Sequence, residues 1–208
     1  MSAPRMTTPR SVARPATRPV VLRAGVLAMF LAACGAASGS GTKAADPLAP
    51  TTLYPLLANS AWSYDVDTGE ALTTLAISRV TTVVGSRVEV SSGGEPQVYE
   101  VTDEGIFRPQ TGTWLLKRPI QVGATWDSVG GMTAHVVAVD ATASVPAGEY
   151  HHCVRVEERG GEKGQEIATL YCPHAGPVVV ESKVVLPTSG GTAEVRAALR
   201  GFTIGGAE

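Results

Sequence analysis

Hydrophobic and polar residues alternate along much of the C-terminal half of the chain. From Val178 to Leu186 the even-numbered positions are mostly apolar, whereas Glu181 and Lys183 fall on the opposite face. From Ala193 to Arg200 the apolar residues occupy odd positions and the charges occupy even ones. A period of two predicts β-strands with one face on a core and the other in water.

Glycine and serine pairs divide this pattern into short segments, at 93–94, 130–131, 160–161 and 189–191. Such pairs mark turns, and no long stretch has helical periodicity. We therefore predict an all-β domain, a curved antiparallel meander of about ten strands. A half-barrel, a barrel and a two-layer sandwich all fit this pattern. An alternative places one short helix at about 193–200.

The N-terminal region has a different pattern. Five arginines and no acidic residue precede an apolar run of ten residues, 24–33. Ten residues are too few to cross a bilayer as a helix, which takes about 20. A basic region, a short apolar run and small residues at its end are typical of a secretory signal.

The end of this run resembles the lipobox of bacterial lipoproteins. Its residues are Leu31-Ala32-Ala33-Cys34-Gly35. The resemblance implies that Cys34 is acylated and becomes the first mature residue, so that two or more acyl chains hold the protein on a bilayer. An ordinary secretory signal is the alternative. Gly35 and Ala36 are not acidic, which favours the outer membrane over the inner one.

These features divide the chain into a signal peptide (1–33), a tether (34–50) and one domain (51–208). The tether is rich in small residues, polar residues and Pro, and such a composition is typical of a flexible linker. Removing the signal leaves 12 of the 17 Lys and Arg residues against 19 Asp and Glu, a net charge of about −7. This charge argues against a nucleic-acid partner.

A weak internal repeat lies within the domain. Pro55-Leu56 precedes Trp62 as Pro119-Ile120 precedes Trp126. Asn59 and Gly123 stand shortly before the two tryptophans, and both residue types tolerate the left-handed backbone of a turn. We interpret the repeat as two strand entries, each ending on a buried indole. Two aromatic platforms lining a ligand groove are the functional alternative.

Several short motifs resemble those of a set of bacterial secreted proteins and lipoproteins of unknown function. The matching segments are Tyr54-Pro55-Leu56 with Trp62-Ser63-Tyr64, Pro119 to Trp126, Val145-Pro146-Ala147-Gly148 up to Val156, and Tyr171 to Val178. The resemblance covers about 54–182 and includes no catalytic constellation. It implies an architecture similar to that of periplasmic lipoprotein carriers with a curved half-barrel sheet. Ala58-Asn59-Ser60 and Pro177 depart from the motifs.

The two cysteines of the domain fall in adjacent predicted strands, 150–159 and 166–172. If Glu162-Lys163 is the tip of the hairpin, Arg159 faces Glu166 and Cys153 faces Cys172. Opposed residues in antiparallel strands lie within disulfide reach, and export places them in an oxidising compartment. We predict a Cys153–Cys172 disulfide.

The same register places His151 opposite His174, both two residues from a cysteine. Two Cys and two His on one face could hold zinc or copper. We prefer the disulfide with two solvated imidazoles beside it, and we expect no metal and no cofactor. We place His152 towards the core side or a strand end, and His135 half-buried in a strand.

Catalytic motifs are absent from the sequence: there is no G-x-S-x-G, no phosphate-binding glycine loop and no H-E-x-x-H. The acidic pairs, Glu157-Glu158 among them, are expected at strand ends or on solvated faces. We therefore expect a non-enzymatic protein.

Two hypotheses follow for its mode of action. In the first, the domain binds a lipid, an acyl chain or an envelope protein on an open apolar face. In the second, the core is filled and the domain acts structurally, through surface contacts. An open apolar cavity would distinguish the first from the second.

Overall fold

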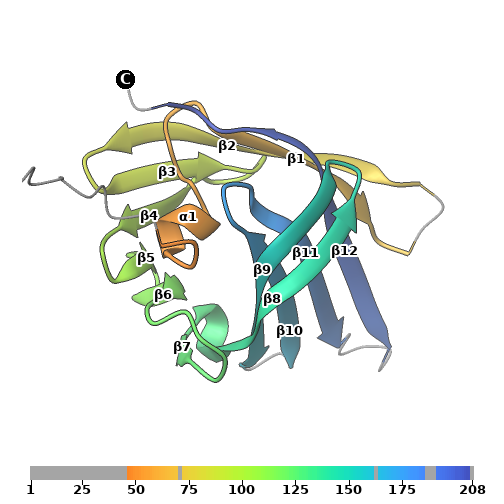
Figure 1. The fold of residues 1–208 in the computed structure, drawn as a ribbon. Helices are drawn as coiled ribbons and strands as arrows, with labels where there is room; N and C mark the ends of the chain where they lie inside the picture. Colours follow the sequence, from red (N-terminus) through yellow and green to blue (C-terminus); the bar gives the residue numbers. More distant parts are fainter. Residues whose placement is uncertain (1–45, 70–71, 162–163, 186–190, 207–208) are drawn as a thin grey trace, which may run out of the picture. The chain divides into compact units, whose positions relative to one another are not determined.

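The domain is a single antiparallel sheet of twelve strands and one short helix (Figure 1). The structure, a computed structural model, describes residues 46–69, 72–161, 164–185 and 191–206. The elements are α1 (Pro50–Leu53), β1 (Ala61–Asp67), β2 (Thr74–Val84), β3 (Arg87–Ser91), β4 (Gln97–Val101), β5 (Gly105–Arg108), β6 (Thr113–Lys117), β7 (Thr125–Asp127), a 3-10 turn η1 (Val129–Gly131), β8 (Met132–Val145), β9 (Gly148–Gly160), β10 (Gln165–Cys172), β11 (Gly176–Val185) and β12 (Thr192–Thr203).

The strands form a barrel-like meander whose first and last strands pair with each other. Their order is β6-β5-β4-β3-β2-β1-β12-β11-β10-β9-β8-β7. The two edges, β6 and β7, are therefore consecutive in the chain, and they contact each other. The predicted all-β class and antiparallel meander are confirmed, with twelve strands in place of about ten. The structure also has one short helix, as the alternative allowed, but this helix is α1 and not 193–200, which lies within β12.

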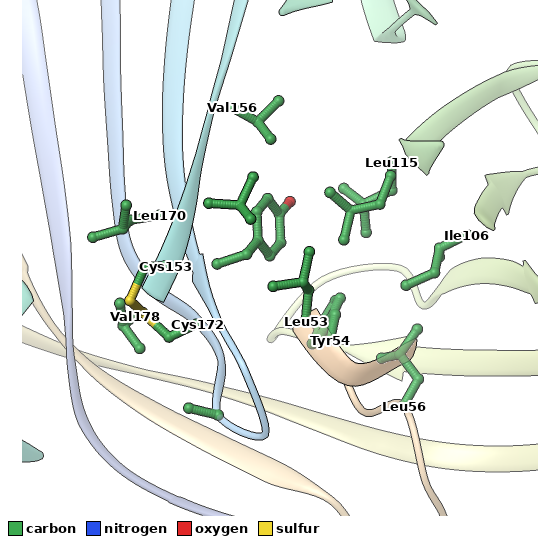
Figure 2. Close-up of a cluster of buried hydrophobic side chains, with 14 of the residues drawn as sticks. Leu53, Tyr54, Leu56, Ile106, Leu115, Cys153, Val156, Leu170, Cys172 and Val178 are labelled. Carbon is green, nitrogen blue, oxygen red and sulfur yellow. A yellow bond between two sulfur atoms is a disulfide. The ribbon is translucent and has the colours of Figure 1, made fainter. Parts of the chain in front are cut away.

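Helix α1 lies within the curve of the sheet (Figure 1). Leu53 is fully buried, and Tyr54 and Leu56 are buried with it. In Figure 2 Leu53 and Tyr54 lie between Leu115 and Ile106 on one side and the strands that carry Cys153 and Cys172 on the other, and Leu56 lies on the side of Ile106. The segment that precedes β1, with α1, thus packs in the interior of the curved sheet.

Residues on the N-terminal side of the expected boundary at 51 also pack against the domain. Leu48 packs against the core, and Ala49 and Pro50 are buried. Pro50 stands in the first turn of α1, where its missing N–H is not needed. The composition of 34–50 as a whole is typical of a linker, and this average did not reveal that Leu48 and Pro50 at its end pack against the core.

The two strand entries of the internal repeat have the backbone expected of them. Asn59 has φ 66° and Gly123 has φ 87°. Trp62 and Trp126 are both buried, as predicted. The entries differ in detail: the Trp62 indole N–H donates to the carbonyl of Ala175 at 2.6 Å, whereas the Trp126 indole N–H has no hydrogen-bond partner among the described residues.

The β8–β9 hairpin is long and bends over the outside of the sheet. The β8–β9 register shifts at three places between Val136 and Ala143, and β8 also contacts β10, β11 and β12. At the tip of the hairpin, the Ala147 N–H donates to the carbonyl of Leu199 in β12 at 3.0 Å. Leu199 lies beside a β-bulge: Ser63 and Tyr64 of β1 pair with Gly201 and Leu199 of β12, which leaves Arg200 as the extra residue.

At the turn between β10 and β11, the first and the last of the four motif segments meet. Trp62 donates to Ala175, and the Tyr64 hydroxyl donates to the carbonyl of Pro177 at 3.0 Å. The rings of Tyr54 and Trp62 pack edge to face with centroids 5.1 Å apart. Gly176 lies beneath both rings with φ 94°. These two motif segments therefore form one packing centre.

We predict that Gly176→Ala destabilises the domain by about 2–4 kcal/mol. A Cβ atom at this position would lie 2.9 Å from Trp62 Nε1 and 3.2 Å from Tyr54 Cδ2, and the positive φ is unfavourable for alanine. Urea unfolding followed by tryptophan fluorescence measures the loss. Gly94→Ala is the matched control, since that glycine has open space around it and should change stability by less than about 0.5 kcal/mol. Equal effects of the two substitutions would contradict the packing role of Gly176.

Candidate functional site

The β9–β10 hairpin has the register that was predicted by placing Glu162-Lys163 at its tip. Arg159 is opposite Glu166, Val156 is opposite Thr169 and Val154 is opposite Tyr171. Cys153 and Cys172 are bonded as a disulfide, and their Cα atoms are 4.2 Å apart. Figure 2 shows the bond beside Leu170 and Val178. Cys34 lies outside the described residues.

The disulfide is buried, although its residues lie on the outer face of the hairpin. Both cysteines have no exposed surface. Residues 153 and 172 lie on the face of the hairpin opposite to Val154 and Tyr171, which face the core. This outer face is covered by the folded-over β8–β9 hairpin. The disulfide is thus enclosed between the sheet and its own hairpin.

The histidines do not have the arrangement that a Cys/His metal site would need. Strand β10 ends at Cys172, and His174 lies in the following turn with φ 63°. His152 also has a positive φ, is exposed, and its Nδ1 atom lies 2.7 Å from Asp140 Oδ1. His151 is exposed, and His135 is half-buried in β8 as predicted. In the described ranges, no three His, Cys, Asp or Glu side chains are placed to share a metal ion.

A polar cluster occupies the interior next to the opening between β6 and β7. Arg108 of β5 reaches across to the β7–β8 connection, where its Nη1 atom donates to Ser128 Oγ at 3.2 Å and lies 3.7 Å from Glu158 Oε1. The same nitrogen donates to the carbonyl of Trp114 at 3.1 Å. Ser128 donates in turn to Glu158. These side-chain contacts connect the β5–β6 edge of the sheet with the β7–β9 edge.

Glu158 corrects an expectation, because this residue of the Glu157-Glu158 pair is buried. A neighbouring pair on a strand points to opposite faces, so only Glu157 lies on the outer side. Tyr99 and Tyr171 complete the cluster. Burial raises the pKa of Tyr99, and the adjacent Arg108 guanidinium opposes the rise. Burial and then the Glu158 carboxylate raise the pKa of Tyr171. Both phenols therefore stay neutral hydroxyls at ordinary pH.

The outer face of β9–β12 has a hollow of about 510 Å³. Charged residues line it in rows that run across the strands. In the first row Arg159, Glu166, Lys183 and Glu194 stand opposite one another, with signs that alternate from strand to strand. Cross-strand pairs of opposite charge favour this register.

The second row has a small residue near its middle. It consists of Glu157, Ala168, Glu181 and Arg196, and Asp67 of β1 extends it. Ala168 is the only member of the two rows without a charge, and the hollow lies over it. We call this hollow and the two rows the charged groove.

Ion pairs connect the side chains of the charged groove. Arg155 lies 3.1 Å from Glu157 and 3.3 Å from Glu181. Arg159 also pairs with Glu157, and Arg196 pairs with Glu181 at 3.6 Å. The result is a continuous chain of five charged side chains across β9, β11 and β12. The sequence predicted one cross-strand charge pair of the groove, Arg159 with Glu166. It did not predict the groove, which also depends on the pairing of β10, β11, β12 and β1.

The fold defines the class: a small antiparallel β domain with a nearly closed sheet around an internal helix. No protein-family model matches the sequence, and no curated protein matches it. Among solved structures it is similar to a protein from Bacteroides fragilis described as exported and as having a YmcC-like fold, with 13% identity, a TM-score of 0.46, and coverage of 72% of this chain and 98% of that one. A second similar structure, described as a lipoprotein, is from Parabacteroides distasonis, with 11% identity, a TM-score of 0.37, and coverage of 73% and 98%.

We predict that the Cys153→Ala/Cys172→Ala double variant loses about 3 kcal/mol of stability, because the crosslink no longer restricts the unfolded chain. Urea unfolding with and without dithiothreitol measures this. Reductant should lower the stability of the wild type to that of the variant and leave the variant unchanged. A wild type whose unfolding midpoint is insensitive to complete reduction would contradict a stabilising disulfide.

We also predict that Arg108→Met costs about 3–5 kcal/mol, because it leaves the Glu158 carboxylate buried without its cation. The Arg108→Met/Glu158→Gln double variant should be more stable than Arg108→Met alone. Arg87→Met serves as the control, since its pair with Glu89 is largely exposed and is worth less than about 1 kcal/mol. Thermal unfolding of the four proteins provides the comparison. Similar losses for Arg87→Met and Arg108→Met would refute the importance of the interior pair.

Proposed function

We propose that this protein is a lipid-anchored lipoprotein of the bacterial cell envelope. Its domain is a non-enzymatic module that binds a partner on its outer surface. The anchor is the acylated Cys34, and the outer membrane is its expected location.

The segment 1–35 supports the anchor. Its arginines, its short apolar run and Leu31-Ala32-Ala33-Cys34 have the order of a lipoprotein signal. In the described residues no helix combines the length and apolar character needed to span a bilayer. The net charge of about −7 after removal of the signal opposes attachment to anionic lipid by charge. Acylation is therefore the means of attachment that the sequence favours.

The disulfide supports export. Structural disulfides persist in oxidising compartments such as the periplasm. With Cys34 acylated, the three cysteines of the chain divide into one lipid-bearing residue and the Cys153–Cys172 pair. No thiol is then left over to react in that compartment.

The filled interior is the observation that favours surface binding over transport of a lipid. A carrier needs an open apolar cavity. Here α1 occupies the space within the sheet, and Leu53, Ile106, Leu116 and Leu199 are fully buried. The hollow over Ala168 lies outside and has charged walls, which do not suit an acyl chain.

Metabolic labelling tests the anchor. Full-length protein expressed in a bacterial host should incorporate an alkyne-tagged palmitate and partition into the membrane fraction, whereas Cys34→Ala should lose both properties. The Cys153→Ala/Cys172→Ala variant is the control and should keep the label. Labelling of Cys34→Ala to the wild-type level would rule out the proposed acylation site.

Native mass spectrometry of the same membrane-extracted protein tests the surface mode. The expected mass is that of the mature acylated chain alone. A stoichiometric additional lipid that survives detergent exchange would instead support a carrier and contradict the proposal.

A further inference from the structure

We infer that a hollow on the outer face of β4, β5 and β6 binds an arginine side chain of a partner polypeptide. This inference rests on the proposed surface-binding function and names the chemistry of the partner. The hollow has a volume of about 440 Å³ and is lined by Glu100, Thr102, Asp103, Glu104, Phe107 and Trp114. We call it the aromatic–acidic hollow.

The strand pairing places three of these side chains in one row. Glu100 of β4 is opposite Phe107 of β5, and Phe107 is opposite Trp114 of β6. Directly opposed residues share one face of a sheet. Tyr99 and Ile106, which alternate with the row, are buried in the core, so the row faces outward. The turn between β4 and β5 supplies the three remaining residues at one end of the hollow.

The two aromatic rings form one wall of the hollow. The centroids of Phe107 and Trp114 are 5.0 Å apart, and their planes are inclined at 60°. Both side chains are half-buried. Because strands carry both rings and the rings pack against each other, the wall is in place before a ligand binds. Side chains that are already ordered lose less entropy on binding.

The indole of Trp114 already has one cation beside it. Lys117 Nζ lies 5.3 Å from the ring centroid, which is within the distance of about 6 Å for a cation–π interaction. Lys117 lines a second hollow, of about 350 Å³, which Trp114 also borders, but it does not line the aromatic–acidic hollow. The ring therefore suits a cation, and Lys117 leaves the first hollow free to receive another.

The carboxylates of the hollow have no cationic partner. In the part of the chain that the structure describes, none of Glu100, Asp103 and Glu104 forms an ion pair. Arg87, the neighbour of Glu100 on β3, pairs with Glu89 at 3.3 Å instead. In the charged groove, by contrast, arginines of the chain itself already bind carboxylates. The aromatic–acidic hollow thus has free negative charge beside an aromatic wall.

An arginine side chain matches both parts of the hollow. Its guanidinium is planar, packs on aromatic rings and donates two parallel hydrogen bonds to a carboxylate. A lysine ammonium is more strongly hydrated, and a quaternary ammonium has no N–H to donate. Nucleic acid and anionic lipid are repelled by the carboxylates and by the net charge of about −7.

Nuclear magnetic resonance of the indole N–H groups tests the inference on the mature protein in a nonionic detergent. Trp62 and Trp126 are buried, whereas Trp114 is half-buried and lines the hollow, so its signal reports binding. The probes are the end-blocked peptides Gly-Arg-Gly, Gly-Lys-Gly and Gly-citrulline-Gly, and choline. We expect the arginine peptide to bind about tenfold or more tightly than the neutral citrulline peptide, with an affinity that falls as salt is raised.

The Glu100→Gln/Glu104→Gln variant identifies the site. It should bind the arginine peptide about tenfold or more weakly than the wild type, because the charge that holds the guanidinium is reduced. Phe107→Leu removes one ring of the wall and should weaken binding as well. The control is Glu95→Gln/Glu149→Gln, which removes two exposed carboxylates outside the hollow and should keep the wild-type affinity. Circular dichroism checks that all variants are folded.

Three results would overturn the inference. One is equal binding of the arginine and citrulline peptides by the wild type. Another is an unchanged affinity of Glu100→Gln/Glu104→Gln for the arginine peptide. The third is binding of choline or of the lysine peptide that is as tight as that of the arginine peptide, since the hollow would then not recognise a guanidinium. None of these results depends on acylation of Cys34, so failure of the peptide assay and failure of the labelling experiment are separable.

Discussion

The pairing of β1 with β12 is the contact on which the remaining structure depends. It brings the segment that precedes β1 into the interior, where α1 and Trp62 pack against the β10–β11 turn. Its bulge leaves the Leu199 carbonyl for the tip of the β8–β9 hairpin. It also sets Asp67 beside Arg196, at the end of the charged groove. One long-range pairing thus positions the filled core, the covered disulfide and the outer hollow.

Local features of this fold could be predicted from sequence because their partners are close along the chain. The β9–β10 register follows from a short hairpin with Arg159 and Glu166 at its base, and Cys153 meets Cys172 as a result. The left-handed backbone of Asn59 and Gly123 follows from residue type alone. The alternation of apolar and polar residues at 178–186 and 193–200 likewise predicted the strands β11 and β12.

The features that escaped prediction involve residues far apart in sequence. Glu158 looks like half of a solvated pair until Arg108, fifty residues earlier in the chain, is placed beside it. The charged groove forms only when β9, β10, β11, β12 and β1 pair in order, which takes four strand pairings. Its floor is Ala168, a residue whose type indicates no binding role. The burial of the disulfide depends on bulges that bend β8–β9 over the sheet, and no residue pattern in that hairpin states the direction of the bend.

The opening of the sheet between β6 and β7 has a consequence for how these molecules crowd together. On the proposed lipid anchor, copies of this protein would share a two-dimensional surface at high local concentration, where a free strand edge is a template for aggregation. The two edges of this sheet are only five and three residues long, contact each other, and are linked by a connection that starts with Arg118-Pro119. Each edge therefore shields the other, and a neighbouring copy finds little free backbone with which to extend the sheet.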